Sequence, residues 1–133
     1  MVKHYTVNLY DALKNSGINY NTALAEKYAA WCARRDNGPA PWGMWPQCHE
    51  QMPIDEETLA EAAAFGDTAV VVIGRTCGES LDVALDKGSY YLTDDETALL
   101  DAVTTRSKKV IVLLNIGNIV DLSWTYFLRP GCR

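Results

Sequence analysis

The sequence lacks long hydrophobic runs and an excess of positive charge, and both absences exclude classes of function. No stretch approaches the roughly 18 uninterrupted apolar residues of a membrane-spanning helix. Twelve basic against seventeen acidic residues give a net charge of −5, which argues against nucleic acid or an anionic membrane surface as partner. The first residues form no apolar signal-peptide core, so we expect a soluble, cytoplasmic protein.

Cysteine pairs at metal-binding or redox spacing are also missing. The four cysteines, at positions 32, 48, 77 and 132, include no C-x-x-C pair. Two disulfides are formally possible in three connectivities. However, Cys32 on an apolar helix face and Cys77 after a core strand favour buried, reduced thiols. The run Cys48-His49-Glu50 offers adjacent ligand types, which rarely converge on one ion. We therefore expect neither a metal nor another cofactor.

Helix and strand signals alternate along the chain and predict one α/β domain over residues 1–133. Apolar periodicity and capping residues predict helices over about 6–16, 21–35, 55–66 and 93–103. The last of these opens with a capping box at Thr93-Asp94-Asp95-Glu96. β-Branched runs predict strands over 68–73 and 110–114, each covered on both faces and paired in parallel. We expect a partial three-layer α/β sandwich, with a mainly parallel sheet and helices on both faces. Two strands are few for such a sheet, so further strands are expected to be missing.

Two segments depart from this alternation. Residues 36–53 carry four prolines and two glycines and predict a long loop. Its apolar side chains, Trp42, Met44, Trp45 and Met52, favour burial over disorder. Residues 125–133 form an atypical tail with neither strand nor helix signals. The missing strands leave exposed edges, through which the chain could form a homo-oligomer.

Candidate ligand-binding residues follow both predicted strands, where open α/β sheets bind ligands. Arg75, Glu79 and Asp82 lie in a glycine-containing segment after the first strand, and residues 115–118 follow the second. A carboxylic acid held near apolar walls can act as a general acid. The residues alone favour the other interpretation, in which Glu79 and Asp82 are solvated surface groups and the glycines shape a turn.

Other chemistries find no support in this region. Ser80 lacks both the closing glycine of a nucleophile elbow and a histidine later in the chain. Cys77 has no neighbouring histidine, because His4 and His49 lie far upstream. The glycines lack the lysine of a phosphate-binding loop. Acyl transfer and nucleotide binding are therefore disfavoured.

Several motifs in register over residues 67–124 resemble one enzyme family. They are the strand ending in Arg75, the Gly78-Glu79 loop, the Lys87-Gly88 step, the helix start at residues 91–96, and the strand ending at residues 114–118. This segment is similar to the α/β sandwich domain that follows the catalytic barrel in family 3 glycoside hydrolases, the β-glucosidase and β-xylosidase group. The likeness extends from about residue 3 to residue 124.

The resemblance implies a retaining glycosidase with its nucleophile on the barrel and its acid/base glutamate on the sandwich, at Glu79. It also implies a substrate-binding role for Asp82, and for Arg75 either a contact with the sugar or a supporting position behind the residues that touch it. Where the family loop continues Gly-x-Asp-Arg after the glutamate, this chain has Ser80-Leu81-Asp82-Val83. The expected partners are a β-linked glucoside or oligosaccharide and the barrel domain. Since the chain contains no barrel, we expect an inactive internal fragment of the enzyme.

Two alternatives belong to other classes of function. Trp42 and Trp45 could stack on a sugar or on a protein partner, which predicts a stand-alone carbohydrate-binding or oligomerisation module. A small flavodoxin-like domain that binds an anion at a helix N-terminus is the weaker alternative.

Overall fold

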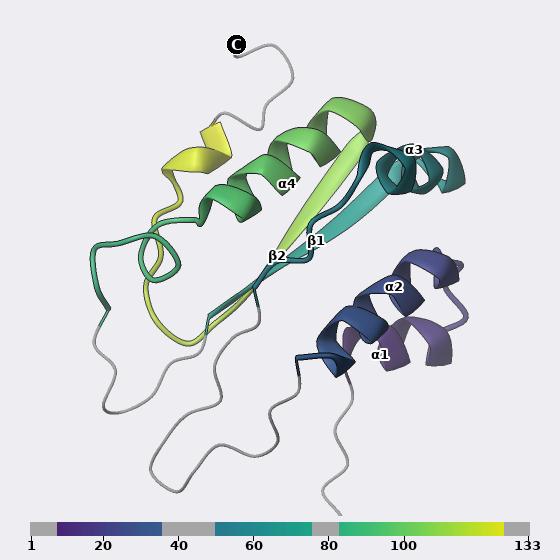
Figure 1. Ribbon diagram of the computed structural model, residues 1–133, viewed down its shortest axis with the longest axis horizontal. Helices are drawn as coiled ribbons and strands as arrows, with labels where there is room; N and C mark the ends of the chain where they lie inside the picture. The colour runs from purple at the N-terminus through teal and green to yellow at the C-terminus, as the bar shows by residue number, and fades with distance from the viewer. Residues whose placement is uncertain (1–7, 36–49, 76–82, 127–133) are drawn as a thin grey trace, which may run out of the picture.

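The structure, a computed structural model, describes residues 8–35, 50–75 and 83–126. The elements follow in the order α1 (Leu9–Asn15), α2 (Thr22–Ala33), α3 (Glu56–Phe65), β1 (Thr68–Arg75), α4 (Asp94–Arg106), β2 (Lys109–Ile116) and the short 3₁₀ helix η1 (Ser123–Tyr126). Each predicted helix and strand is present, and the predicted α/β class is confirmed (Figure 1). The Trp42 and Trp45 part of the predicted loop lies outside the described residues.

Side-chain caps fix where the four α-helices begin. The capping side chains of Asn8, Asn21, Asp55 and Thr93 each accept a hydrogen bond from the backbone N–H three residues later. The prediction that the first helix begins at Thr6 is wrong, because Asn8 is extended and caps a helix that begins at Leu9. Gly17 follows that helix with a φ of 71°, a conformation that glycine adopts without steric cost.

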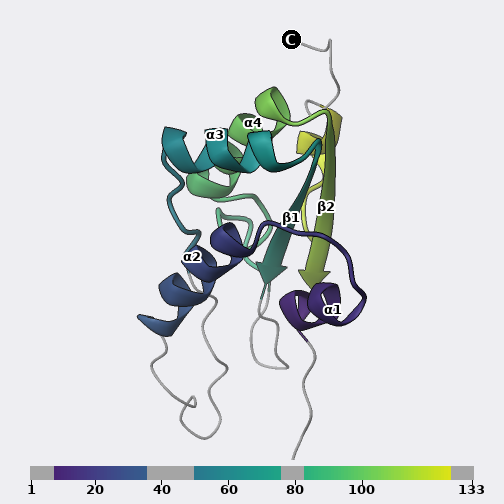
Figure 2. The ribbon, with the colours of Figure 1, turned by 90° about the vertical axis from the view of Figure 1, so that its right-hand side faces the viewer.

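The two strands form a parallel sheet, as predicted. Thr68 pairs with Lys109 and Arg75 with Ile116, so the two strands end side by side. Helix α4 connects them and contacts both, while α3 packs against α4. Figure 2 shows α3 and α4 together on one side of the strands. The arrangement is a partial α/β sandwich whose strands end at a common edge.

Among the described residues, burial in the sheet is one-sided, which differs from the cover on both faces that the β-branched runs predict. Val71 and Ile73 are only 6 % and 1 % exposed and form the core with Leu92 and Leu100. The opposite face carries the alternate residues, of which Val70 and Val72 are 46 % and 43 % exposed. Ile111 and Leu113, paired with these two valines, are also exposed. The helices among the described residues bury only the side that faces α3 and α4.

The prediction that the Cys32 thiol is buried is wrong. Its thiol is free, but the residue is exposed, because the half-buried side of α2 is formed instead by Leu24, Tyr28 and Trp31. The other three cysteines lie outside the described residues. Met52 is 9 % exposed, which confirms the burial predicted for it. None of the helices within the described ranges combines the length and apolar character needed to cross a bilayer.

Candidate functional site

The candidate site lies at the edge where both strands end. β1 ends at Arg75, directly before the segment that contains Glu79 and Asp82. Both carboxylates lie outside the described residues, so their predicted roles remain predictions. Gly74 pairs with Asn115 across the sheet, which brings the starts of the two predicted ligand-binding segments together. A Cβ at Gly74 would lie 4.0 Å from the Asn115 carbonyl oxygen.

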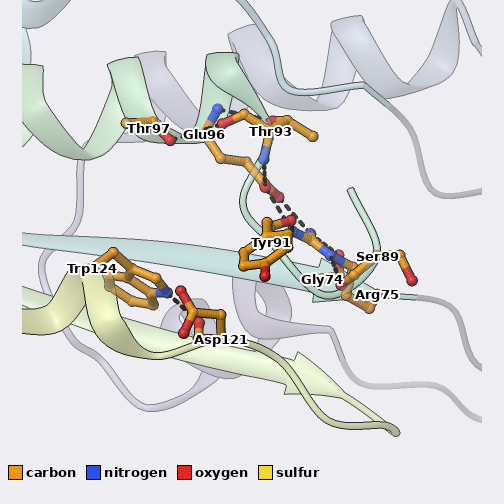
Figure 3. Close-up of polar contacts among 9 residues, drawn as sticks. All are labelled: Gly74, Arg75, Ser89, Tyr91, Thr93, Glu96, Thr97, Asp121 and Trp124. Carbon is orange, nitrogen blue, oxygen red and sulfur yellow. Dashed lines mark hydrogen bonds and ion pairs between the residues drawn. The ribbon is translucent and has the colours of Figure 1, made fainter. Parts of the chain in front are cut away.

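Arg75 is held by the protein on every side of its guanidinium group. Nη1 donates to Glu96 Oε1 at 2.6 Å and to the Gly74 carbonyl at 2.8 Å. Nη2 donates to Glu96 Oε2 at 2.7 Å and to the Tyr91 carbonyl at 3.3 Å, and Nε donates to the Ser89 carbonyl at 3.3 Å. These contacts engage Nε, Nη1 and Nη2 of the guanidinium group (Figure 3). The geometry thus favours a structural role for Arg75, and its predicted contact with substrate remains a prediction.

Glu96 serves two partners at once. Its Oε2 accepts a hydrogen bond from the Thr93 backbone N–H at 2.8 Å, while Thr93 Oγ1 accepts one from the Glu96 N–H at 3.1 Å. This is the capping box predicted from the sequence. The same carboxylate forms the two-pronged ion pair with Arg75, and the two side chains are only 11 % and 6 % exposed. Glu96 therefore links the first turn of α4 to the end of β1.

The ionisation of Glu96 follows from this environment. Burial by itself raises the pKa of the carboxyl group. The hydrogen bonds and charge of Arg75, together with the hydrogen bonds from Thr93, outweigh that effect and hold the pKa below its ordinary value of 4.5. Glu96 is consequently charged at neutral pH, as a partner of the arginine must be.

The segment from residue 84 to residue 91 supplies the other groups around Arg75. Its chain turns at Gly88, which has a φ of 85°, and the Gly88 N–H donates to the Tyr91 carbonyl at 2.9 Å. The Asp121 N–H donates to the Tyr90 carbonyl at 2.8 Å, and Trp124 Nε1 donates to the Asp121 carbonyl at 2.7 Å. The chain leaving β2 therefore braces the turn that contacts Arg75.

Among the described residues, one buried polar atom beyond the end of β2 has no hydrogen-bond partner. Asn118, in the segment predicted to bind a ligand after β2, has a buried Oδ1 that accepts no hydrogen bond within the described structure. A buried acceptor without a partner costs free energy. The strand edge thus retains one unsatisfied acceptor.

The sequence indicates Arg75 and the capping box separately, but not the contact between them. The signal for that contact is the glutamate at the third position of α4, which by itself predicts only a cap. A carboxylate in that position has a second oxygen to offer, and Arg75 lies 21 residues earlier in the chain. Only the folded crossover brings the two residues together.

A shallow groove lies away from this edge, between α2 and the start of α3. Its volume is about 300 Å³, and it is lined by Lys27, Ala30, Trp31, Arg34, Met52, Pro53, Ile54, Asp55 and Thr58. The Lys27 ammonium donates to Thr58 Oγ1 at 2.8 Å, and the Arg35 guanidinium lies 3.3 Å from the centre of the Trp31 ring. Side chains of the protein thus already engage both the lysine and the aromatic face.

The chain is similar to β-glucosidases in sequence. It is 40 % identical over 122 residues to a β-glucosidase of Ruminococcus albus, covering 90 % of this chain and 13 % of that protein. It is 30 % identical over 144 aligned residues to β-glucosidase A of Butyrivibrio fibrisolvens, covering 90 % of this chain and 17 % of that protein. The chain therefore spans less than a fifth of the length of these relatives.

Solved structures and a family model agree with these relatives. A β-glucosidase of Paenibacillus barengoltzii matches with a TM-score of 0.81 and 40 % identity, over 92 % of this chain and 13 % of the enzyme. β-Glucosidase 3B of Thermotoga neapolitana, solved in complex with α-D-glucose, matches with a TM-score of 0.81 and 32 % identity, over 93 % and 18 %. The model of the glycosyl hydrolase family 3 C-terminal domain matches residues 1–130. The chain therefore belongs to the family of glycosyl hydrolase family 3 C-terminal domains.

Proposed function

We propose that this domain supplies Glu79 as the general acid/base of a retaining β-glucosidase, whose nucleophile lies on a separate barrel domain. The membership of residues 1–130 in a glycosyl hydrolase family supports the proposal, because hydrolysis of a glycosidic bond needs an acid/base carboxyl group and Glu79 follows the end of β1. The β-glucosidase names of the relatives support a β-linked glucoside as substrate. Location at the carboxyl end of a parallel strand suits a ligand-facing group.

The reaction requires Glu79 to act twice. A retaining glycosidase holds its two carboxyl groups about 5–5.5 Å apart. In the first step the barrel carboxylate attacks the anomeric carbon, while protonated Glu79 gives its proton to the departing glycosidic oxygen. In the second step ionised Glu79 takes a proton from water, which displaces the enzyme carboxylate from the sugar. One glutamate alone cannot perform this double displacement.

A chimeric enzyme tests the role of Glu79. The matching segment of the Paenibacillus barengoltzii β-glucosidase is replaced by this chain, and Glu79→Ala is compared with Glu57→Ala, a control on the exposed side of α3. We expect Glu79→Ala to lower kcat for an alkyl β-glucoside by about 10²–10⁴-fold, the usual contribution of general acid catalysis. 2,4-Dinitrophenyl β-glucoside should still form the glycosyl-enzyme, because its leaving group needs no proton.

Azide provides the second readout of the same experiment. As an anionic nucleophile it needs no general base, so it should restore turnover of the dinitrophenyl substrate by Glu79→Ala and give β-glucosyl azide. Equal losses on both substrates with no azide product would contradict the proposal. So would a parent chimera that folds and binds glucose but does not turn over.

A further inference from the structure

We propose that Glu96 is a positioning residue for the acid/base segment and acts through Arg75. This inference rests on the proposed role of Glu79. Glu96 is not placed in contact with substrate. Its task is to fix the end of β1, from which the segment carrying Glu79 departs after Arg75.

The Glu96 side chain is itself held in one position. Its backbone lies in the first turn of α4, and its Oε2 is held at 2.8 Å by the Thr93 N–H. Both carboxylate oxygens bind the guanidinium group, at 2.6 and 2.7 Å. A carboxylate held by a helix cap and by a two-pronged arginine has little rotational freedom left.

Glu96 in turn holds the Arg75 guanidinium group. Its guanidinium also donates to the carbonyls of Gly74, Ser89 and Tyr91. The Gly74 contact bends the arginine side chain back onto its own strand, and the other two contacts tie it to the chain between β1 and α4 (Figure 3). In the pair with Glu96 both partners are charged and two hydrogen bonds run in parallel, so Glu96 is the strongest of the partners named here.

The Arg75–Glu96 pair lies close in sequence to the proposed acid/base residue. Glu79 lies four positions after Arg75. An acid must lie within hydrogen-bond reach of the oxygen it protonates, and a displacement of about 1 Å can cost roughly 10²-fold in rate. A shift of Arg75 changes the position from which this segment starts. Loss of the Arg75–Glu96 pair should therefore reduce proton donation selectively.

Two substitutions separate this positioning from the capping of α4. Glu96→Gln keeps an oxygen for the Thr93 N–H but removes the charge and one acceptor of the ion pair. Thr93→Ala removes the acceptor for the Glu96 N–H and leaves the ion pair in place. Both are made in the chimeric enzyme, and kcat is measured for the alkyl and the 2,4-dinitrophenyl β-glucoside. The ratio of the two rates does not depend on the fraction of folded enzyme.

We expect Glu96→Gln to lower kcat for the alkyl glucoside by at least about 10-fold more than for the dinitrophenyl glucoside. The pKa of the acid/base group in this variant, taken from the basic limb of the pH profile of kcat, should also differ from that in the parent chimera. Thr93→Ala should lower Tm and leave the ratio unchanged. Arg75→Lys, which keeps the charge but loses the two-pronged geometry, should change the ratio in the same direction as Glu96→Gln.

An unchanged ratio in Glu96→Gln, or an equal change in Thr93→Ala, would overturn the inference. Failure of both Glu96→Gln and Arg75→Lys to fold would assign the pair to folding alone and overturn it as well. These outcomes differ from failure of the proposed function. In that case Glu79→Ala itself shows no dependence on the leaving group.

Discussion

At the scale of single residues, the informative contacts converge on one carboxylate. Glu96 caps a helix and neutralises a buried arginine. Removing one partner of a buried ion pair is far more costly than removing one of an exposed pair, because a charge stays buried without compensation. The other ion pairs among the described residues, such as Lys87 with Asp94, have much more exposed side chains, and pairs of that kind contribute little.

The lowered pKa of Glu96 predicts a dependence of stability on pH. The unfolded chain binds this proton near the ordinary pKa of 4.5, whereas the folded chain binds it only at lower pH. The stabilisation is therefore complete above the unfolded value and is lost as the pH falls through the folded value. Urea unfolding from about pH 7 to about pH 3 should show a loss in the wild-type chain that Glu96→Gln lacks.

The magnitude at neutral pH gives a separate check. Glu96→Gln should lower the free energy of unfolding by about 1.5–3 kcal/mol, the usual value for hydrogen bonds to a charged group. Glu57→Gln, on an exposed helix surface, should change it by less than about 0.5 kcal/mol. Parallel pH profiles for wild type and Glu96→Gln would show that another group controls the acid transition.

At the scale of elements, each helix start depends on a local signal and each strand on its neighbours. The caps at Asn21, Asp55 and Thr93 are readable in the sequence, because the capping side chain bonds three residues away. A β-branched run carries no such local information about which side is covered. The run of residues 68–73 consequently predicted burial on two faces, where the structure buries one.

The one-sided burial of β1 predicts opposite costs for neighbouring residues. Ile73→Ala should lower the free energy of unfolding by about 2–5 kcal/mol, because it leaves a cavity in the core. Val72→Ala should cost less than about 1 kcal/mol, because Val72 is already 43 % exposed in this chain. Urea unfolding of the two variants of the 133-residue chain measures both. Similar losses would mean that the Val72 face is covered in solution.

At the scale of the whole molecule, the domain is one part of a larger catalytic unit in its relatives. The chain covers 13 % of the Paenibacillus barengoltzii enzyme and 18 % of the Thermotoga neapolitana enzyme. Within the described ranges, the sheet has two strands and one exposed apolar face, so its core is small. Further segments of such an enzyme would add buried surface and, under the proposed mechanism, the nucleophilic carboxylate.

The isolated chain should therefore be catalytically silent. We expect no turnover of 2,4-dinitrophenyl β-glucoside above the Glu79→Ala control, because the proposed double displacement takes its nucleophile from a barrel domain. Tryptophan fluorescence titrated with glucose and cellobiose provides the companion measurement. Saturable quenching that survives Glu79→Ala and disappears with Trp42→Ala would favour the stand-alone carbohydrate-binding module. Measurable turnover would contradict the division of the active site between two domains.

The sequence by itself determined the elements, the parallel crossover, the family and the capping box, because these depend on short-range periodicity, local hydrogen bonds and motif order. Only the tertiary structure decided that Arg75 binds Glu96, that Cys32 is exposed and that one sheet face lacks a covering helix layer among the described residues. Each of these depends on contacts between segments far apart in the chain. Local patterns cannot specify that Arg75 and Glu96 meet, because they lie 21 residues apart and their contact is set by how α4 packs on the strands.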